Sequence, residues 1–244
     1  MVLISACMEI KLLILLLIAA FSAMAGGALG RWERIHPNWM RSEVRHGVIA
    51  FGGGALLAAV SLVLVPKGMA LQPAWASLLS FGGGAFAFLM CDRYFTNRGT
   101  PLSQLLAMLL DFVPEAIVVG AVISRNYGEA LFLTLIIAAQ NIPEAFNAYR
   151  EITHRGGGKG MAQHALLVIS LAALSGVGWG FLGYFVFHPD HVLLGSIMTF
   201  CAGGIVYLVF RDVAPQAQLE RAWYPSMGAV VGFMVGMAGH AFVG

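Results

Sequence analysis

Long apolar segments separated by short polar ones dominate the pattern along the chain. Six segments contain no Asp, Glu, Lys or Arg: 12–30, 47–66, 68–91, 165–187, 192–210 and 222–244. Two further segments, 99–124 and 130–149, are of similar length but contain internal acids. A helix needs about 20 apolar residues to cross the hydrocarbon core of a bilayer. The pattern therefore predicts eight transmembrane helices, and it lacks the alternation that is typical of spanning strands.

The composition supports this class. Hydrophobic residues make up 59% of the 244 residues and charged residues 11%, whereas a soluble domain has about a quarter charged residues. We therefore expect residues 1–244 to form a single all-α transmembrane domain whose surroundings are the lipid bilayer. We expect the first helix to be retained rather than cleaved as a signal peptide, because arginines follow its apolar run and no positive cluster precedes it.

The basic residues alternate between the predicted loops. Eleven of the 14 Lys and Arg residues lie in the loops that join helices 1–2, 3–4, 5–6 and 7–8, whereas the other loops contain only Lys67 and Arg125. Short loops rich in Lys and Arg stay in the cytoplasm. This distribution predicts an integral protein of the inner or plasma membrane with both termini outside, in the periplasm or the extracellular space.

Two segments from opposite halves of the chain resemble each other. "FGGGALLAAVSLVLVP" (51–66) and "FCAGGIVYLVFRDVAP" (200–215) both begin with Phe, carry early glycines and end in Pro. With the orientation above, the second helix runs outward and the seventh inward. Inverted repeats of this kind underlie many secondary transporters. We expect helices 1–3 and 6–8 to be related in this way around a central pair, helices 4 and 5.

Helices 4 and 5 each carry polar side chains on one face. Asp111 and Glu115 are four residues apart, as are Gln140 and Glu144, so the members of each pair share a helix face. Asn141 lies beside the second pair. These five residues are the candidate metal ligands.

A proline directly precedes each of the two glutamates. Pro114 cannot donate a hydrogen bond to the carbonyl of Leu110, and Pro143 cannot donate one to the carbonyl of Ala139. Lipid offers no replacement donor. We expect the prolines to loosen both helices and to leave carbonyl oxygen atoms that a water-lined cavity or a cation satisfies.

Three carboxylates within the membrane need a balancing charge. Arg125 and Arg150 lie at helix ends, and no Lys or Arg lies within 99–124 or 130–149. One solution is that the acids are protonated and bond between helices. The other is a divalent cation, which neutralises two carboxylates and takes oxygen ligands. The repetition of the whole pattern favours the cation.

The segments "DFVPEA" (111–116) and "QNIPEA" (140–145) resemble the paired signature of the ZIP (Zrt-, Irt-like) divalent metal transporters. The family pattern is His-Asn-x-Pro-Glu-Gly on helix 4 and a similar motif on helix 5. The resemblance implies eight helices with both ends outside, a metal site at mid-membrane, uptake into the cytoplasm and a possible homodimer. It also implies that helices 1, 4, 5 and 6 move as a unit against helices 2, 3, 7 and 8.

Carried over by position, the first metal site of the family corresponds to Asp111, Glu115, Gln140 and Glu144, and the second to Phe112, Asn141 and the two glutamates. Phe112 cannot ligate, and Ser175 and Gly176 stand where the family often has Glu-Pro on helix 6. We therefore expect one metal rather than two. The remaining ligands are oxygen atoms, which favours Mn²⁺ or Fe²⁺, while Zn²⁺ stays a candidate.

The residues and the resemblance together predict uptake of a divalent transition-metal cation, which is the substrate rather than a catalytic cofactor. The alternative is a membrane protein that binds the metal without moving it, as a sensor or an assembly factor. The sequence lacks the His-Glu-x-x-His motif of an intramembrane metalloprotease. We expect neither an enzyme nor a nucleic-acid partner.

Overall fold

The computed structural model describes residues 2–35, 42–96, 103–155, 161–187, 191–218 and 223–243, and some side chains within these ranges, that of Asp111 among them, are not described. Every regular element in the described ranges is a helix. The α-helices are α1 (Val2–Ile35), α2 (Ser42–Ala59), α3 (Val65–Leu71), α4 (Ala74–Thr96), α5 (Ser103–Val122), α6 (Tyr127–Arg155), α7 (Met161–Leu182), α8 (His191–Leu208), α9 (Ala214–Ala217) and α10 (Tyr224–Val243). Three π-helical segments, η1 (Val60–Leu64), η2 (Gly183–Phe187) and η3 (Val209–Val213), continue α2, α7 and α8. The prediction of an all-α protein is confirmed for this part of the chain.

Five helical segments are long and apolar enough to cross a membrane. Among the described residues they are Ala6–Glu33, Val44–Leu71, Ala74–Tyr94, Ala162–Phe187 and His191–Ala217. Three of them include a π-helical segment: one span consists of α2, η1 and α3, another of α7 and η2, and a third of α8, η3 and α9. A shorter apolar stretch, Phe112–Val122, lies in α5. These helices indicate a membrane-embedded protein.

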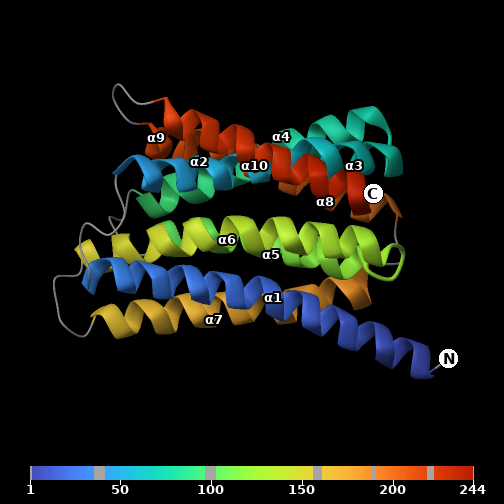
Figure 1. Ribbon diagram of the computed structural model, residues 1–244. Coiled ribbons are helices and arrows are strands. Elements are labelled where there is room, and N and C mark those ends of the chain that lie inside the picture. Colours follow the sequence, from blue (N-terminus) through green and yellow to red (C-terminus); the bar gives the residue numbers. More distant parts are fainter. Residues whose placement is uncertain are drawn as a thin grey trace.

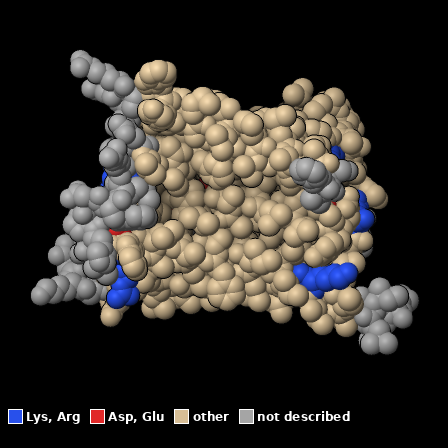
Figure 2. All heavy atoms as spheres, viewed as in Figure 1, with Lys and Arg blue, Asp and Glu red and all other residues tan. Residues whose placement is uncertain are grey.

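The surface of the bundle is apolar where a soluble protein would be polar. Leu78, Leu79 and Phe86 on α4 and Leu171 on α7 are all more than half exposed. Figure 2 shows a face on which Lys and Arg gather at the two ends, with a broad band of mostly uncharged residues between them. Large exposed apolar surfaces of this extent need a covering. A lipid bilayer supplies one, with the charged ends in water.

The helices form two groups that lie against each other (Figure 1). The first group contains α1, α5, α6 and α7, and the second contains α2, α3, α4, α8 and α10 with η1, η3 and α9. The start of α1 and the end of α10 lie at the same end of the bundle, which we call the termini end (Figure 1). The opposite end, where α1 and α6 finish, is the loop end. α6 therefore runs from the termini end to the loop end.

Glycines allow close helix crossings within the second group. At α2 with α10 and at α4 with α8, a Cβ on any of five glycines would collide with a backbone carbonyl oxygen of the facing helix. The colliding pairs are Gly54 with Ala229, Gly228 with Gly47, Gly232 with Phe51, Gly203 with Phe81 and Gly84 with Phe200. Small residues permit such approaches between membrane helices. The glycine-rich stretches of the sequence are therefore packing sites here.

Pro114 and Pro143 do not interrupt their helices, contrary to the expected loosening, whereas two other prolines follow widened turns. Both Pro114 and Pro143 lie within uninterrupted α-helix, so neither helix is broken beside its glutamate. The widened turns occur elsewhere, in η1 and η3. Each of these π-helical segments ends two residues before a proline, Pro66 and Pro215 respectively. There the N–H of Val65 bonds to the carbonyl of Val60, and η3 has the equivalent bond. A π-helical turn absorbs the clash of a proline ring with the preceding turn.

Candidate metal site

The two copies of the Pro–Glu motif meet between α5 and α6. The connection is a short turn, closed by a hydrogen bond from the N–H of Arg125 to the carbonyl of Val122. Asn126 then caps α6, because its Oδ1 accepts a hydrogen bond from the N–H of Glu129 at 3.1 Å. A tight turn with a cap makes the two helices antiparallel neighbours. Residues of one motif can thus face residues of the other.

Glu115 and Gln140 are the residues in contact. The Nε2 of Gln140 donates to both carboxylate oxygen atoms of Glu115, at 2.7 Å each. Glu115 is 5% exposed and Gln140 is fully buried. A buried carboxylate is stable only when it is hydrogen-bonded or paired. The amide supplies hydrogen bonds without supplying a charge, so the negative charge of an ionised Glu115 is not neutralised by this contact.

Asn141 faces a different helix. Its Nδ2 donates to the backbone carbonyl of Ala19 on α1 at 3.1 Å. Its Oδ1 is buried and has no hydrogen-bond partner among the described residues. The amide oxygen atom is therefore available to a cation or a water molecule, while the amide nitrogen fixes α6 to α1.

Phe112 stands at a position that the resemblance assigns to a ligand of the second metal. Its ring is buried and packs on Gly176 of α7, where a Cβ would collide with the ring. The neighbouring Ser175 is exposed, and its Oγ donates to the carbonyl of Ala172 at 2.7 Å. Neither Phe112 nor Gly176 offers a side-chain ligand.

Glu144 lies one helical turn after Gln140 and is partly exposed. It lines a cavity of about 30 Å³ between α2, α6 and the η3–α9 segment. The other lining residues are Ile49, Gly52, Gly53, Pro143, Asn147, Val213 and Gln216. The cavity has room for about one water molecule or one ion. The second glutamate thus borders an open space, whereas the first is enclosed.

No group of three or more His, Cys, Asp and Glu side chains gathers anywhere in the described part of the chain. The Asp111 side chain lies outside that part, so the convergence of Asp111, Glu115 and Glu144 stays a prediction. The structure does bring Glu115 and Gln140 together. It places Asn141 against α1 and Glu144 at the cavity.

In comparisons with known proteins, no family model and no curated protein matches the chain. The functional assignment therefore rests on the chemistry of these residues.

Polar contacts join the two groups of helices at the termini end. Lys67 of α3 forms an ion pair with Glu129 of α6. Arg125, in the turn after α5, lies with its Nη1 at 2.9 Å from the Nδ1 of His191 at the start of α8. Sequence reasoning treated Lys67 as a loop cation and Arg125 as a cation in a loop at a helix end, and it predicted neither contact. At the loop end, Arg45 of α2 approaches Glu33 of α1 less closely, at 3.8 Å.

Sequence reasoning also missed Asn147 and Gln216. Asn147 follows Glu144 by three residues and so shares its helix face, a signal that was available in the sequence. Gln216 directly follows Pro215, and only the folded arrangement brings it to the same cavity.

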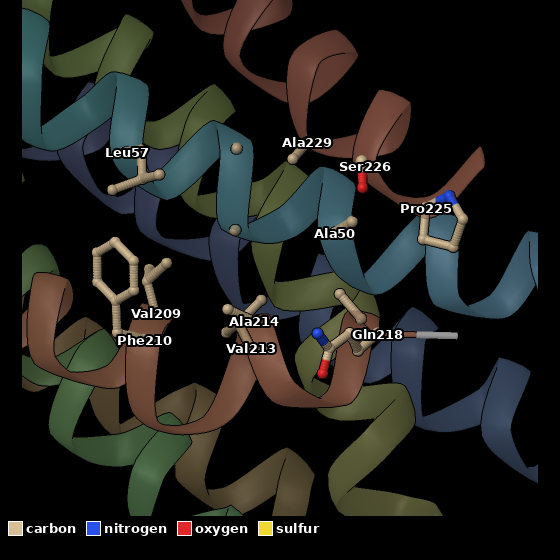
Figure 3. A pocket seen from close by; sticks show the side chains of 13 residues that line it. Ala50, Leu57, Val209, Phe210, Val213, Ala214, Gln218, Pro225, Ser226 and Ala229 are labelled. Carbon is tan, nitrogen blue, oxygen red and sulfur yellow. The ribbon is translucent and has the colours of Figure 1, made fainter. Parts of the chain in front are cut away.

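A second cavity lies next to the first and differs from it in the chemistry of its lining. This apolar crevice, of about 280 Å³, lies between α2, α10 and the η3–α9 segment (Figure 3). It shares Gly53 and Val213 with the small cavity. Its lining is almost entirely hydrocarbon, with Gln218 and Ser226 as the polar side chains at one end. The crevice suits apolar groups, whereas the small cavity offers a carboxylate and two amides.

Proposed function

We propose that this chain transports a divalent transition-metal cation across the membrane through a site on α5 and α6, and that it is a divergent member of the ZIP family. The observation that carries the proposal is the contact of buried Glu115 with Gln140, through which one motif copy faces the other. A buried carboxylate in this position, with no Lys or Arg within 126–149 or 99–124, suits a mobile cation as a ligand. Glu144 and the free oxygen atom of Asn141 are further ligands on α6.

We further propose that α5, α6 and α10 also cross the membrane, giving eight spans. Two features support this count. First, α1 begins and α10 ends at the same end of the bundle (Figure 1), as an even number of crossings requires. Second, α6 has 29 residues, which at 1.5 Å per residue gives about 43 Å, more than the hydrocarbon thickness.

An inverted repeat relates helices 1–3 to helices 6–8 in this proposal. Its support is that η1 and η3 occupy equivalent positions of the segments 51–66 and 200–215. The glycine crossings correspond in the same way, since Gly54 and Gly203, like Phe51 and Phe200, are equivalent under that alignment. The α2–α10 contact then repeats the α4–α8 contact. Such repeats position a substrate site between the repeated units.

The site holds one cation rather than two in this account, because the ring of Phe112 takes the place of a ligand and packs on Gly176. The oxygen-only ligand set favours Mn²⁺ or Fe²⁺, with Zn²⁺ as the competing candidate. The alternating distribution of Lys and Arg places the loop end in the cytoplasm. Entry then proceeds from the termini end to the loop end.

Reconstitution in liposomes that contain a metal-sensitive dye tests the function. We expect the wild-type chain to admit Mn²⁺, Fe²⁺ or Zn²⁺, and the double variant Glu115→Gln/Glu144→Gln to admit none. Glu9→Gln serves as a matched control, because Glu9 lies near the start of α1, away from the site in sequence. Cation binding by the wild-type chain without entry would instead identify the sensor or assembly factor. Neither binding nor entry would refute the proposal.

A further inference from the structure

The small cavity beside Glu144 joins the two groups of helices. Asn147 reaches it from α6 of the first group and Gln216 from α9 of the second. Its volume of about 30 Å³ depends on glycine in α2, because a Cβ at Gly52 would lie 3.0 Å from the Cγ of Pro143. The sequence therefore keeps open a space that a larger side chain would fill.

The amides that face this cavity have no other partner within the part of the chain that the structure describes. Neither Asn147 nor Gln216 forms a hydrogen bond or an ion pair with another residue in the described ranges. A polar side chain that faces a small cavity needs a partner there, and water or an ion provides one. Together with the Glu144 carboxylate, the amide oxygen atoms form a ligand set of the type that divalent cations accept.

The order of polar groups along α6 gives this set a place in transport. Gln140, Glu144 and Asn147 follow one another toward the loop end, in steps of about 6 Å and about 4.5 Å along the helix axis. Glu144 therefore lines the cavity and lies along α6 between Gln140 of the enclosed contact and Asn147. A cation held near Glu115 can keep one ligand, Glu144, while it moves to the next site.

We propose that Glu144, Asn147 and Gln216 form a second, weaker cation site, from which the ion leaves toward the loop end. This inference rests on the proposed transport function. One carboxylate and two neutral amides bind a divalent cation more weakly than two carboxylates do, and an exit site must release what it binds. Because its ligands come from both groups of helices, a displacement of one group against the other dismantles the site and frees the ion.

The variant Gln216→Glu tests the inference by adding a carboxylate to the exit site. Extra ligand charge raises affinity, so we expect Mn²⁺ to bind about tenfold more tightly and the maximal rate of entry into liposomes to fall by a similar factor. The matched control is Gln218→Glu. Gln218 lies two residues away and borders the apolar crevice instead (Figure 3), so both affinity and rate should stay at wild-type values.

A second variant, Asn147→Ala, removes a ligand without adding charge. We expect its maximal rate to fall about threefold, with little change in the cation concentration that gives half the maximal rate, because the first site is intact. Thermal unfolding in detergent checks that both variants are folded. We expect them to be, because Asn147 and Gln216 are partly exposed.

The outcomes separate the two proposals. If the wild-type chain admits cations and Gln216→Glu binds and transports as the wild type does, the exit site is wrong and the transport function stands. The same conclusion follows if Gln218→Glu has an equal effect, because the added charge would then act without site specificity. If the wild-type chain admits no cation, both proposals fail.

Discussion

The two copies of the Pro–Glu motif are nearly the same in sequence and have different surroundings in the structure. Glu115 is 5% exposed and accepts two hydrogen bonds from Gln140 of the neighbouring helix. Glu144 is more exposed and borders a cavity that it shares with Asn147 and Gln216. Both glutamates follow a proline in uninterrupted α-helix. The backbone around them is alike, and the packing of other helices makes the difference.

The comparison assigns different tasks to the two carboxylates. An enclosed carboxylate provides a strong electrostatic interaction, because water and ions do not screen it. A carboxylate at the edge of a cavity can contact both an enclosed ion and a departing one. In the proposed transporter, Glu115 therefore holds the cation and Glu144 passes it on.

The largest difference between the two glutamates is expected when each one is neutralised singly. We expect Glu115→Gln to lower cation affinity by about a hundredfold to several thousandfold, because loss of one partner of a buried charge pair costs on the order of 3–5 kcal/mol. Glu144→Gln should lower it about tenfold, since this side chain is less enclosed. Equilibrium dialysis with Mn²⁺ measures both values, with Glu9→Gln as the control. Equal losses in the two variants would contradict the assigned roles.

Phe112 lies three residues before the enclosed Glu115 on α5. Its ring packs on Gly176. We expect Phe112→Ala to lower the free energy of unfolding in detergent or lipid by about 1–2 kcal/mol. This is less than the about 3–5 kcal/mol typical of soluble cores, because the apolar membrane environment leaves mainly the packing loss. The control Phe86→Ala, at a 60% exposed position, should have almost no effect. A loss at Phe86 as large as that at Phe112 would argue against the packed ring.

The ion pair of Lys67 with Glu129 lies outside the proposed metal site and joins the two groups of helices at the termini end. We expect Lys67→Met or Glu129→Gln to open that end more often. Thr134 lies on α6, five residues after Glu129, and is 1% exposed. In a background without the native cysteines, Thr134→Cys should then react about threefold faster with a water-soluble maleimide. The charge-reversed pair Lys67→Glu/Glu129→Lys should restore slow labelling. Unchanged rates in the single variants would show that the ion pair does not close this end.

Asp111 is expected to give the smallest effect. Replacement of its oxygen ligands by imidazole in Asp111→His should shift the competition between Zn²⁺ and Mn²⁺ about threefold toward Zn²⁺, because nitrogen ligands favour zinc. Competition for entry into liposomes measures this ratio. A large zinc advantage in the wild type that Asp111→His leaves unchanged would contradict the proposed metal preference.

Apolar length and the spacing of acids were sufficient to predict the helical class and to find the motif residues that meet, Glu115 and Gln140. The sequence did not reveal that the helices stay regular at Pro114 and Pro143 and widen before Pro66 and Pro215 instead. A π-helical turn precedes two of these prolines and not the other two, so a proline alone gives no local signal for a widened turn. The same holds for Gln216, which reaches the cavity only because η3 and α9 fold toward α6. Lys67 and Glu129, far apart in the sequence, also meet only through tertiary packing.

Anomalous X-ray scattering from crystals grown with Mn²⁺ tests the central claim most directly. The account predicts one strong peak between α5 and α6, within about 2.0–2.6 Å of carboxylate oxygen atoms of both Glu115 and Glu144, with a weaker peak, if any, beside Asn147 and Gln216. A structure in which Mn²⁺ is present in the crystal but no peak lies between the two glutamates, or in which their side chains point apart, would contradict it.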